Sequence, residues 1–105
     1  MTNPDANPAR GEATLVIAGH RRVLRPSFAA LVAAEEELGP LFALVERASE
    51  GQLRLSEIAG LFWHCCANRA SLSREEVGEA VMTMGLAGAS APLRELLKQI
   101  LQGRA

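Results

Sequence analysis

Helix-stopping and helix-starting signals divide most of the chain into short segments. Gly39 is followed by Pro40, which is the order expected where one helix ends and the next begins. Gly51 can stop that next helix. Residues 73–76 read Ser-Arg-Glu-Glu, the Ser-x-x-Glu spacing of a capping box that opens a further helix. These signals predict a compact bundle of four to five short helices.

Apolar residues recur at helical spacing inside each of these segments. Ser27 suits the N-cap of the first helix, and Pro92 is expected to begin the last helix after small, flexible residues 85–90. Ser56 can cap a third helix that runs to about Ala70. This helix is apolar over a wide arc, which indicates a central place in the core or partial cover by a partner. The stripes are Phe28, Leu31, Val32 and Leu38; Leu41, Leu44, Val45 and Ala48; Ile58, Leu61, Phe62 and Cys65; Val77, Val81 and Met84; and Leu93, Leu96, Leu97, Ile100 and Leu101.

The segment before the helices is typical of a β-hairpin. Residues 12–17 are rich in β-branched side chains, residues 21–25 can run back, and Gly19-His20 can supply a tight two-residue turn between them. A two-stranded ribbon alone is marginal in water, so helices must cover at least one of its faces. The predicted fold class is therefore α+β, with an N-terminal β-hairpin packed on the helical bundle.

The expected turn also assigns side chains to the two faces of the hairpin. It pairs Val16 with Val23 across the strands on one face, and it places Leu15, Ile17 and Leu24 on the other. Both faces are partly apolar, so one is available for a partner once the other packs on the helices.

Charge and composition narrow the function classes. The chain has 11 basic and 12 acidic residues, whereas nucleic-acid binders usually carry a basic excess that neutralises phosphates. No apolar run approaches the roughly 20 residues needed to span a bilayer. Residues 1–10 also lack the apolar core of a signal peptide. We therefore expect a cytoplasmic protein without nucleic-acid or membrane partners, with a disordered tail at residues 1–10 and a single domain at residues 11–105.

His64, Cys65 and Cys66 are the residue types most suggestive of metal or thiol chemistry. Consecutive helical residues point about 100° apart, so these three cannot converge on one ion as zinc ligands do. A cysteine nucleophile needs a base that faces it, and helical neighbours do not face each other. We expect no metal, no cofactor and no enzymatic activity, with both cysteines acting as small packing residues.

Two charged residues interrupt apolar stripes. Glu35 lies on the stripe of the first helix and Arg69 on that of the third. Buried charges need partners, so one interpretation is a structural ion pair between Glu35 and Arg69. The alternative is that both lie at the ends of their stripes and reach water.

Several stretches, taken in order, carry a resemblance to a known family. Arg10-Gly11-Glu12 leads into the hairpin, Arg25-Pro26-Ser27-Phe28-Ala29-Ala30-Leu31 follows it, and Leu72-Ser73-Arg74-Glu75-Glu76-Val77 opens the fourth helix. From Arg10 to about Gln102 the chain resembles the gene-transfer-agent tail family, small proteins encoded among phage-like tail genes and grouped with phage tail assembly chaperones. The third helix departs from the family pattern, because small and glycine-rich residues are expected there and this chain has Phe62-Trp63-His64-Cys65-Cys66.

The resemblance implies binding to a tail component, such as the tape-measure or tail tube protein, during assembly, and it offers no catalytic residues. A tube subunit normally builds its wall from long β-strands, whereas this sequence predicts one short hairpin. The expected function is therefore that of a tail assembly chaperone, and the alternative is a minor structural component retained in the particle. Two partner-binding surfaces are predicted from their apolar character: the hairpin face with Val16 and Val23, and the flank of the third helix with Ala59, Trp63 and Ala70.

Overall fold

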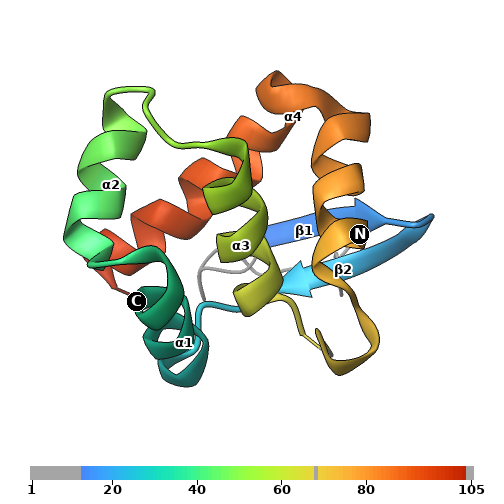
Figure 1. Ribbon diagram of the computed structural model, residues 1–105, viewed down its shortest axis with the longest axis horizontal. Helices are drawn as coiled ribbons and strands as arrows, with labels where there is room; N and C mark the ends of the chain where they lie inside the picture. The colour runs from blue at the N-terminus through green and yellow to red at the C-terminus, as the bar shows by residue number, and fades with distance from the viewer. Residues whose placement is uncertain (1–12, 68, 104–105) are drawn as a thin grey trace, which may run out of the picture.

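The computed structural model describes residues 13–67 and 69–103, and the tail predicted at residues 1–10 lies outside this range. Within the described residues, a two-stranded antiparallel hairpin packs against four α-helices, which confirms the α+β prediction. In Figure 1 the first part of α4 lies against the hairpin, and α3 occupies the middle of the molecule. The elements are β1 (Ala13–Ile17), β2 (His20–Leu24), α1 (Phe28–Leu38), α2 (Leu41–Ser49), α3 (Leu55–Cys65), the 3₁₀ turn η2 (Arg69–Ser71) and α4 (Arg74–Gln102).

The hairpin turns one residue earlier than predicted. Ala18 and Gly19 form the turn, with φ values of 53° and 81°, the positive pair that a type I′ turn requires. Val16 therefore lies opposite Arg21, and the predicted pairing of Val16 with Val23 is wrong. Type I′ turns twist in the same sense as the strands they join, and this match outweighs the cost of about 1–2 kcal/mol for one left-handed alanine.

The two faces of the hairpin are nevertheless assigned as predicted. The real register differs from the predicted one by two residues, so each side chain keeps its face. Leu15, Ile17 and Leu24 are buried, whereas Val16 on the opposite face is exposed. The helices cover the predicted face.

The chain beyond α3 pairs with the second edge of the hairpin. Leu24 and Cys66 form an isolated antiparallel bridge, the N–H of Arg25 donates to the carbonyl of Cys65 at 2.6 Å, and that of Ala67 donates to Val23 at 3.0 Å. Because these backbone groups pair with β2, α3 cannot continue to Ala70 and ends at Cys65. The predicted length of the third helix is therefore wrong by about one turn.

The core is centred on α3, as the wide apolar arc of this helix predicts. Phe62 and Leu61 are fully buried, and each of the other main elements adds side chains around them. The largest fully buried side chains are Phe62, Leu15, Ile17, Leu24, Leu44, Leu61, Leu96, Val77, Val81 and Cys65.

Three of the predicted helix ends are confirmed. The Ser27 hydroxyl accepts the N–H of Ala30 at 3.1 Å, and Ser73 and Glu76 form the reciprocal capping box at the start of α4. Gly39 ends α1 with a φ of 92°. The predicted N-cap at Ser56 is wrong, because α3 begins at Leu55 and its N-cap is Arg54. The Glu57 carboxylate accepts the N–H of Arg54 at 2.9 Å and so satisfies this end of the helix.

The last helix is longer than predicted. Gly85, with φ 79° and ψ 160°, breaks α4 into two halves, but helical structure resumes directly after it and includes Pro92. The helix is broken at Gly85, but residues 86–90 are helical and not flexible as predicted. The predicted helix start at Pro92 is also wrong. Ala87, Ala89 and Ala91 are strong helix formers, and they carry the helix up to the proline despite the backbone hydrogen bond that Pro92 cannot donate.

Candidate partner-binding surfaces

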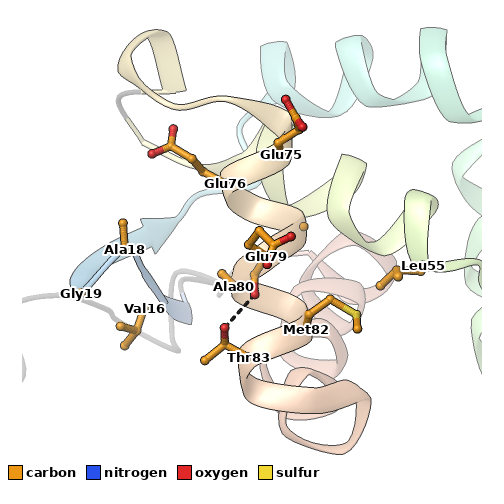
Figure 2. Close-up of a pocket in the computed structure, with 11 residues that line it drawn as sticks. Val16, Ala18, Gly19, Leu55, Glu75, Glu76, Glu79, Ala80, Met82 and Thr83 are labelled. Atoms are coloured by element: carbon orange, nitrogen blue, oxygen red, sulfur yellow. Dashed lines mark hydrogen bonds between the residues drawn. The ribbon is translucent and has the colours of Figure 1, made fainter.

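A groove runs across the first half of α4, from the tip of the hairpin to the start of α3 (Figure 2). Its large apolar side chains are Val16, Leu55 and Met82, which are 55%, 42% and 62% exposed. Val16 was predicted as a partner-binding residue, whereas Leu55 and Met82 were not, because they come from α3 and α4 and lie far from Val16 in the sequence. The groove is completed by Ala18, Gly19, Glu75, Glu76, Gly78, Glu79, Ala80 and Thr83.

Three carboxylates, of Glu75, Glu76 and Glu79, line this groove on its α4 side, and we call it the acidic groove. Glu75 and Glu76 lie in the first turn of α4, where negative charge is favoured by the helix dipole. Local helix stability therefore accounts for the position of two of the three carboxylates. Together they border the apolar groove residues with negative charge.

Val23 does not accompany Val16 in this groove. It shares the hairpin face with Val16, but it lies opposite Thr14 and is half-buried, and its carbonyl accepts the N–H of Ala67. Of the two valines predicted to form a partner-binding face, only Val16 lines the acidic groove.

The predicted flank of the third helix does not form one surface. Ala59 is buried, and Ala70 is exposed but lies in η2 rather than in α3. Trp63 is half-buried, and its Nε1 donates to the Leu72 carbonyl at 2.8 Å. The structure thus gives the three residues different surroundings, although Trp63 and Ala70 line a common pocket.

Two guanidinium groups cover the Trp63 ring. That of Arg74 lies 4.7 Å from the ring centroid and that of Arg69 lies 5.6 Å from it, both within cation–π range. His64 meets the same ring edge-on, with centroids 5.0 Å apart. Trp63 therefore has internal partners on several sides, which favours a role in holding α3 to the start of α4.

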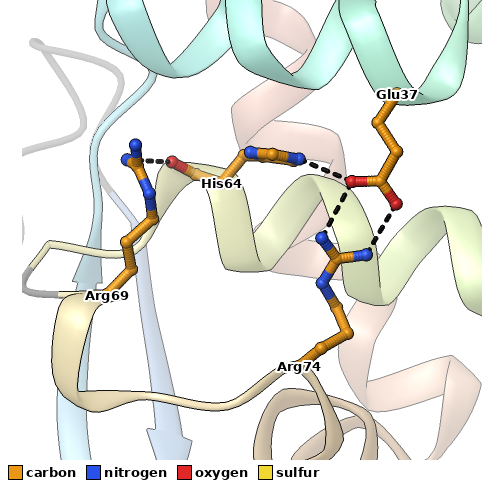
Figure 3. Close-up of polar contacts among 4 residues, drawn as sticks. All are labelled: Glu37, His64, Arg69 and Arg74. Carbon is orange, nitrogen blue, oxygen red and sulfur yellow. Dashed lines mark hydrogen bonds and ion pairs between the residues drawn. The ribbon is translucent and has the colours of Figure 1, made fainter.

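A polar cluster joins α1, α3 and α4 beside this tryptophan (Figure 3). Arg74 donates two hydrogen bonds to the Glu37 carboxylate, at 2.7 and 2.8 Å, and Nε2 of the buried His64 lies 2.7 Å from the same carboxylate. The hydrogen bonds from Arg74 and then from His64 lower the pKa of Glu37 from its ordinary value of 4.5 to about 2. Glu37 is therefore ionised at neutral pH and holds three helices together.

The predicted ion pair between Glu35 and Arg69 is not formed. The Glu35 carboxylate accepts the N–H of Leu41 at 3.1 Å, and Arg69 donates to the His64 carbonyl at 3.2 Å. Glu37 is the member of the acidic run that faces α3, because it follows the buried Ala30 and Ala34 at helical spacing. That spacing is the signal in the sequence that points to Glu37.

The sequence of this domain matches a known protein family. A family model described as phage tail tube protein, GTA-gp10, matches residues 10–103. The chain belongs to this family. The match spans the hairpin and all four described helices, and it confirms the resemblance to gene-transfer-agent tail proteins. No curated protein and no solved structure matches the chain.

Membership of this tail family points to other tail proteins as partners, and phage tail families are typically made of non-catalytic structural or assembly proteins. Burial is the main cause that raises the pKa of Cys65 to about 12 and that of Cys66 to about 11, so both are protonated thiols at neutral pH. Their side chains pack in the core beside β2.

Within the described residues, no three histidine, cysteine or acidic side chains are grouped so that they could hold a metal ion. Within residues 13–67 and 69–103, no helix combines the length and the apolar character needed to cross a membrane.

Proposed function

We propose that this tail-family protein is a non-catalytic assembly chaperone, which binds a tape-measure or tail tube protein through the acidic groove before that partner is built into the tail. The observation that carries the proposal is the exposure of Val16, Leu55 and Met82 in one groove. Exposed apolar residues gathered in this way mark interaction sites.

A chaperone must release its partner as well as hold it. The apolar side chains of the groove attract an apolar partner surface. The adjoining carboxylates of Glu75, Glu76 and Glu79 keep the empty groove hydrated, and they make partner binding sensitive to salt. A small apolar area bordered by charge suits a reversible contact. The groove therefore has the chemistry of a temporary docking surface.

The strand content supports this choice over a subunit of the tube wall. Each strand of the hairpin has five residues, and within the described residues the sheet has two strands. A tube wall requires long strands that pair between subunits. The second candidate function is a minor structural component retained in the particle, favoured by the family description of a tail tube protein.

The test is co-expression with the tape-measure or tube protein encoded in the same gene cluster, with the soluble fraction of that partner as the readout. Val16→Asp places a carboxylate among the apolar side chains of the groove, so we expect it to lower the soluble fraction. Phe42→Asp is the matched control, because Phe42 on α2 is 78% exposed and does not line the groove. Circular dichroism checks that both variants keep the fold.

Two results would contradict the proposal. Either the partner is equally soluble with and without this protein, or Val16→Asp and Phe42→Asp have the same effect. Trp63→Ala is a poor probe, because it removes the ring packed against Arg69 and Arg74 and should destabilise the fold itself.

A further inference from the structure

A second groove lies between α2 and the second half of α4, and it shares no lining residue with the acidic groove. Figure 1 shows these two helices side by side, α2 in green and the end of α4 in red. Its basic side chains are Arg94 and Lys98, both exposed, so we call it the basic groove. Its other lining residues are Val45, Ala48, Ser49, Ser90, Leu93, Leu97, Leu101 and Gln102.

The leucines of this groove continue along one side of α4. Leu93, Leu97 and Leu101 are four residues apart, and Leu86 lies seven residues before Leu93 on the same side. Leu86 and Leu101 are both more than half exposed. At 1.5 Å per residue, the stripe from the first to the last leucine is about 22 Å long, or roughly four helical turns.

The walls of the groove determine what kind of segment can occupy it. Both walls are helices, whose backbone groups are already paired within the helix, so the groove offers side chains and no strand edge. An α-helix satisfies its own backbone hydrogen bonds, so it can fill this groove through side-chain contacts alone. Leu93, Leu97 and Leu101, each four residues after the last, also form the kind of i, i+4 ridge that packs against another helix.

We propose that the basic groove binds an amphipathic α-helix of a partner protein, with acidic residues along one flank of its apolar stripe. Arg94 and Lys98 lie on the same flank of α4, one turn apart, and carboxylates at the matching positions of a partner helix would lie opposite them. The identity of the partner as a tail protein rests on the proposed function, but the chemistry of the groove does not.

A second copy of this chain is a poorer occupant of the groove. A two-fold contact brings the basic groove of one copy against that of the other, so the Arg94 and Lys98 side chains of both copies would gather at one contact. Like charges placed together in this way oppose association. Charge complementarity thus favours a foreign acidic helix over self-association.

The test uses two designed peptides of about 20 residues, long enough to form a helix. Both carry leucines at alternating three- and four-residue spacing; one has glutamates on its flank and the other has lysines at the same positions. Binding to the full-length protein is measured by fluorescence anisotropy at low and at high salt. We expect the glutamate peptide to bind more tightly, and its advantage to shrink as salt screens the charges.

Variants of the groove then locate the contact. Arg94→Glu combined with Lys98→Glu should weaken the glutamate peptide by about tenfold and favour the lysine peptide, whereas Arg21→Glu combined with Arg54→Glu, an equal charge change elsewhere, should have little effect. Leu101→Ser should also weaken binding, and Met82→Ser in the acidic groove should not. These two variants are a matched pair, because Leu101 and Met82 are exposed to similar degrees, 56% and 62%.

Three outcomes would overturn the inference: no binding of either peptide, equal affinity for both, or a dimer in sedimentation equilibrium that is lost in Leu101→Ser. The last would show that a second copy covers the groove. Peptide binding needs no tail protein, so its failure leaves the co-expression result intact. Conversely, a partner that stays insoluble in co-expression would remove the proposed function without affecting peptide binding.

Discussion

The two halves of α4 differ in charge and in what they contact. The first half, before Gly85, carries Glu75, Glu76 and Glu79 and packs beside the hairpin. The second half carries Arg94 and Lys98 and lines a groove with α2, so its charged groove residues have the opposite sign. Both halves leave large apolar side chains exposed next to these charges.

This comparison shows how one broken helix can present two different docking surfaces. Gly85 redirects the chain, so the two halves contact different parts of the fold while sharing one core. Apolar contact alone discriminates poorly between partners, whereas charge of opposite sign at the two grooves can select different segments.

The largest effect is expected where the second half enters the core. Leu96→Ala should lower the free energy of unfolding by about 2–5 kcal/mol, because Leu96 is fully buried and its removal leaves a cavity. Leu101→Ala, in the groove, should change it by less than about 1 kcal/mol. Urea denaturation of the two variants measures the difference, and similar losses would show that the groove is part of the core.

An intermediate effect is expected at the boundary between the halves. Gly85→Ala should destabilise the protein by about 1–3 kcal/mol, because the φ of 79° with ψ of 160° is a conformation that only glycine adopts readily. Gly78→Ala, within the first half, should stabilise it by about 0.5–1 kcal/mol, since an added Cβ meets no atom within 4 Å. Thermal melts of the two variants should therefore shift in opposite directions, and shifts of the same sign would argue against the kink.

The smallest effect concerns the polar cluster that attaches the first half to α1 and α3. Hydrogen bonds from Arg74 and His64 lower the pKa of Glu37 from 4.5 to about 2, so its stabilising contribution is present above about pH 4.5 and is lost as the pH falls toward 2. Solvent screens this carboxylate, which is 41% exposed, and the contribution is correspondingly modest.

Glu37→Gln should remove this part of the acid dependence of stability, as followed by urea denaturation at several pH values. Arg74→Gln should remove most of it as well, since Arg74 is the main cause of the lowered pKa. Should Glu37→Gln leave the acid dependence unchanged while Arg74→Gln alters it, the cluster would have been assigned to the wrong carboxylate.

Much of the fold could be predicted from local signals. Ser27, Gly39 and the Ser73 capping box determine helix ends through contacts within one turn, and strand parity determines which hairpin residues are buried. The register could not be predicted, because an unusual left-handed Ala18 forms the turn. The end of α3 was also missed, since it depends on pairing between Cys66 and the distant Leu24.

The candidate site could be predicted only in part. Exposure of Val16 follows from alternation along β1, whereas Leu55 and Met82 join it through the packing of three elements. The spacing of Trp63 on α3 predicted that its ring is exposed to a partner. The guanidinium groups of Arg69 and Arg74, which follow α3 in the chain, instead cover the ring. Arg74 pairs with Glu37 and not with the neighbouring Glu35 or Glu36. This choice depends on how α1 is rotated about its axis relative to α3, and the apolar stripes alone do not determine that rotation.

Quantitative mass spectrometry of purified, mature particles tests most directly whether this protein acts in assembly and then leaves. The measurement compares its copy number with those of the tape-measure and tube proteins in the same particles, and with its own amount in cell extracts during assembly. The account predicts abundant protein in the extracts and little in the particles. A fixed, ring-like number of copies in every finished particle would contradict it and establish the protein as a structural component of the tail.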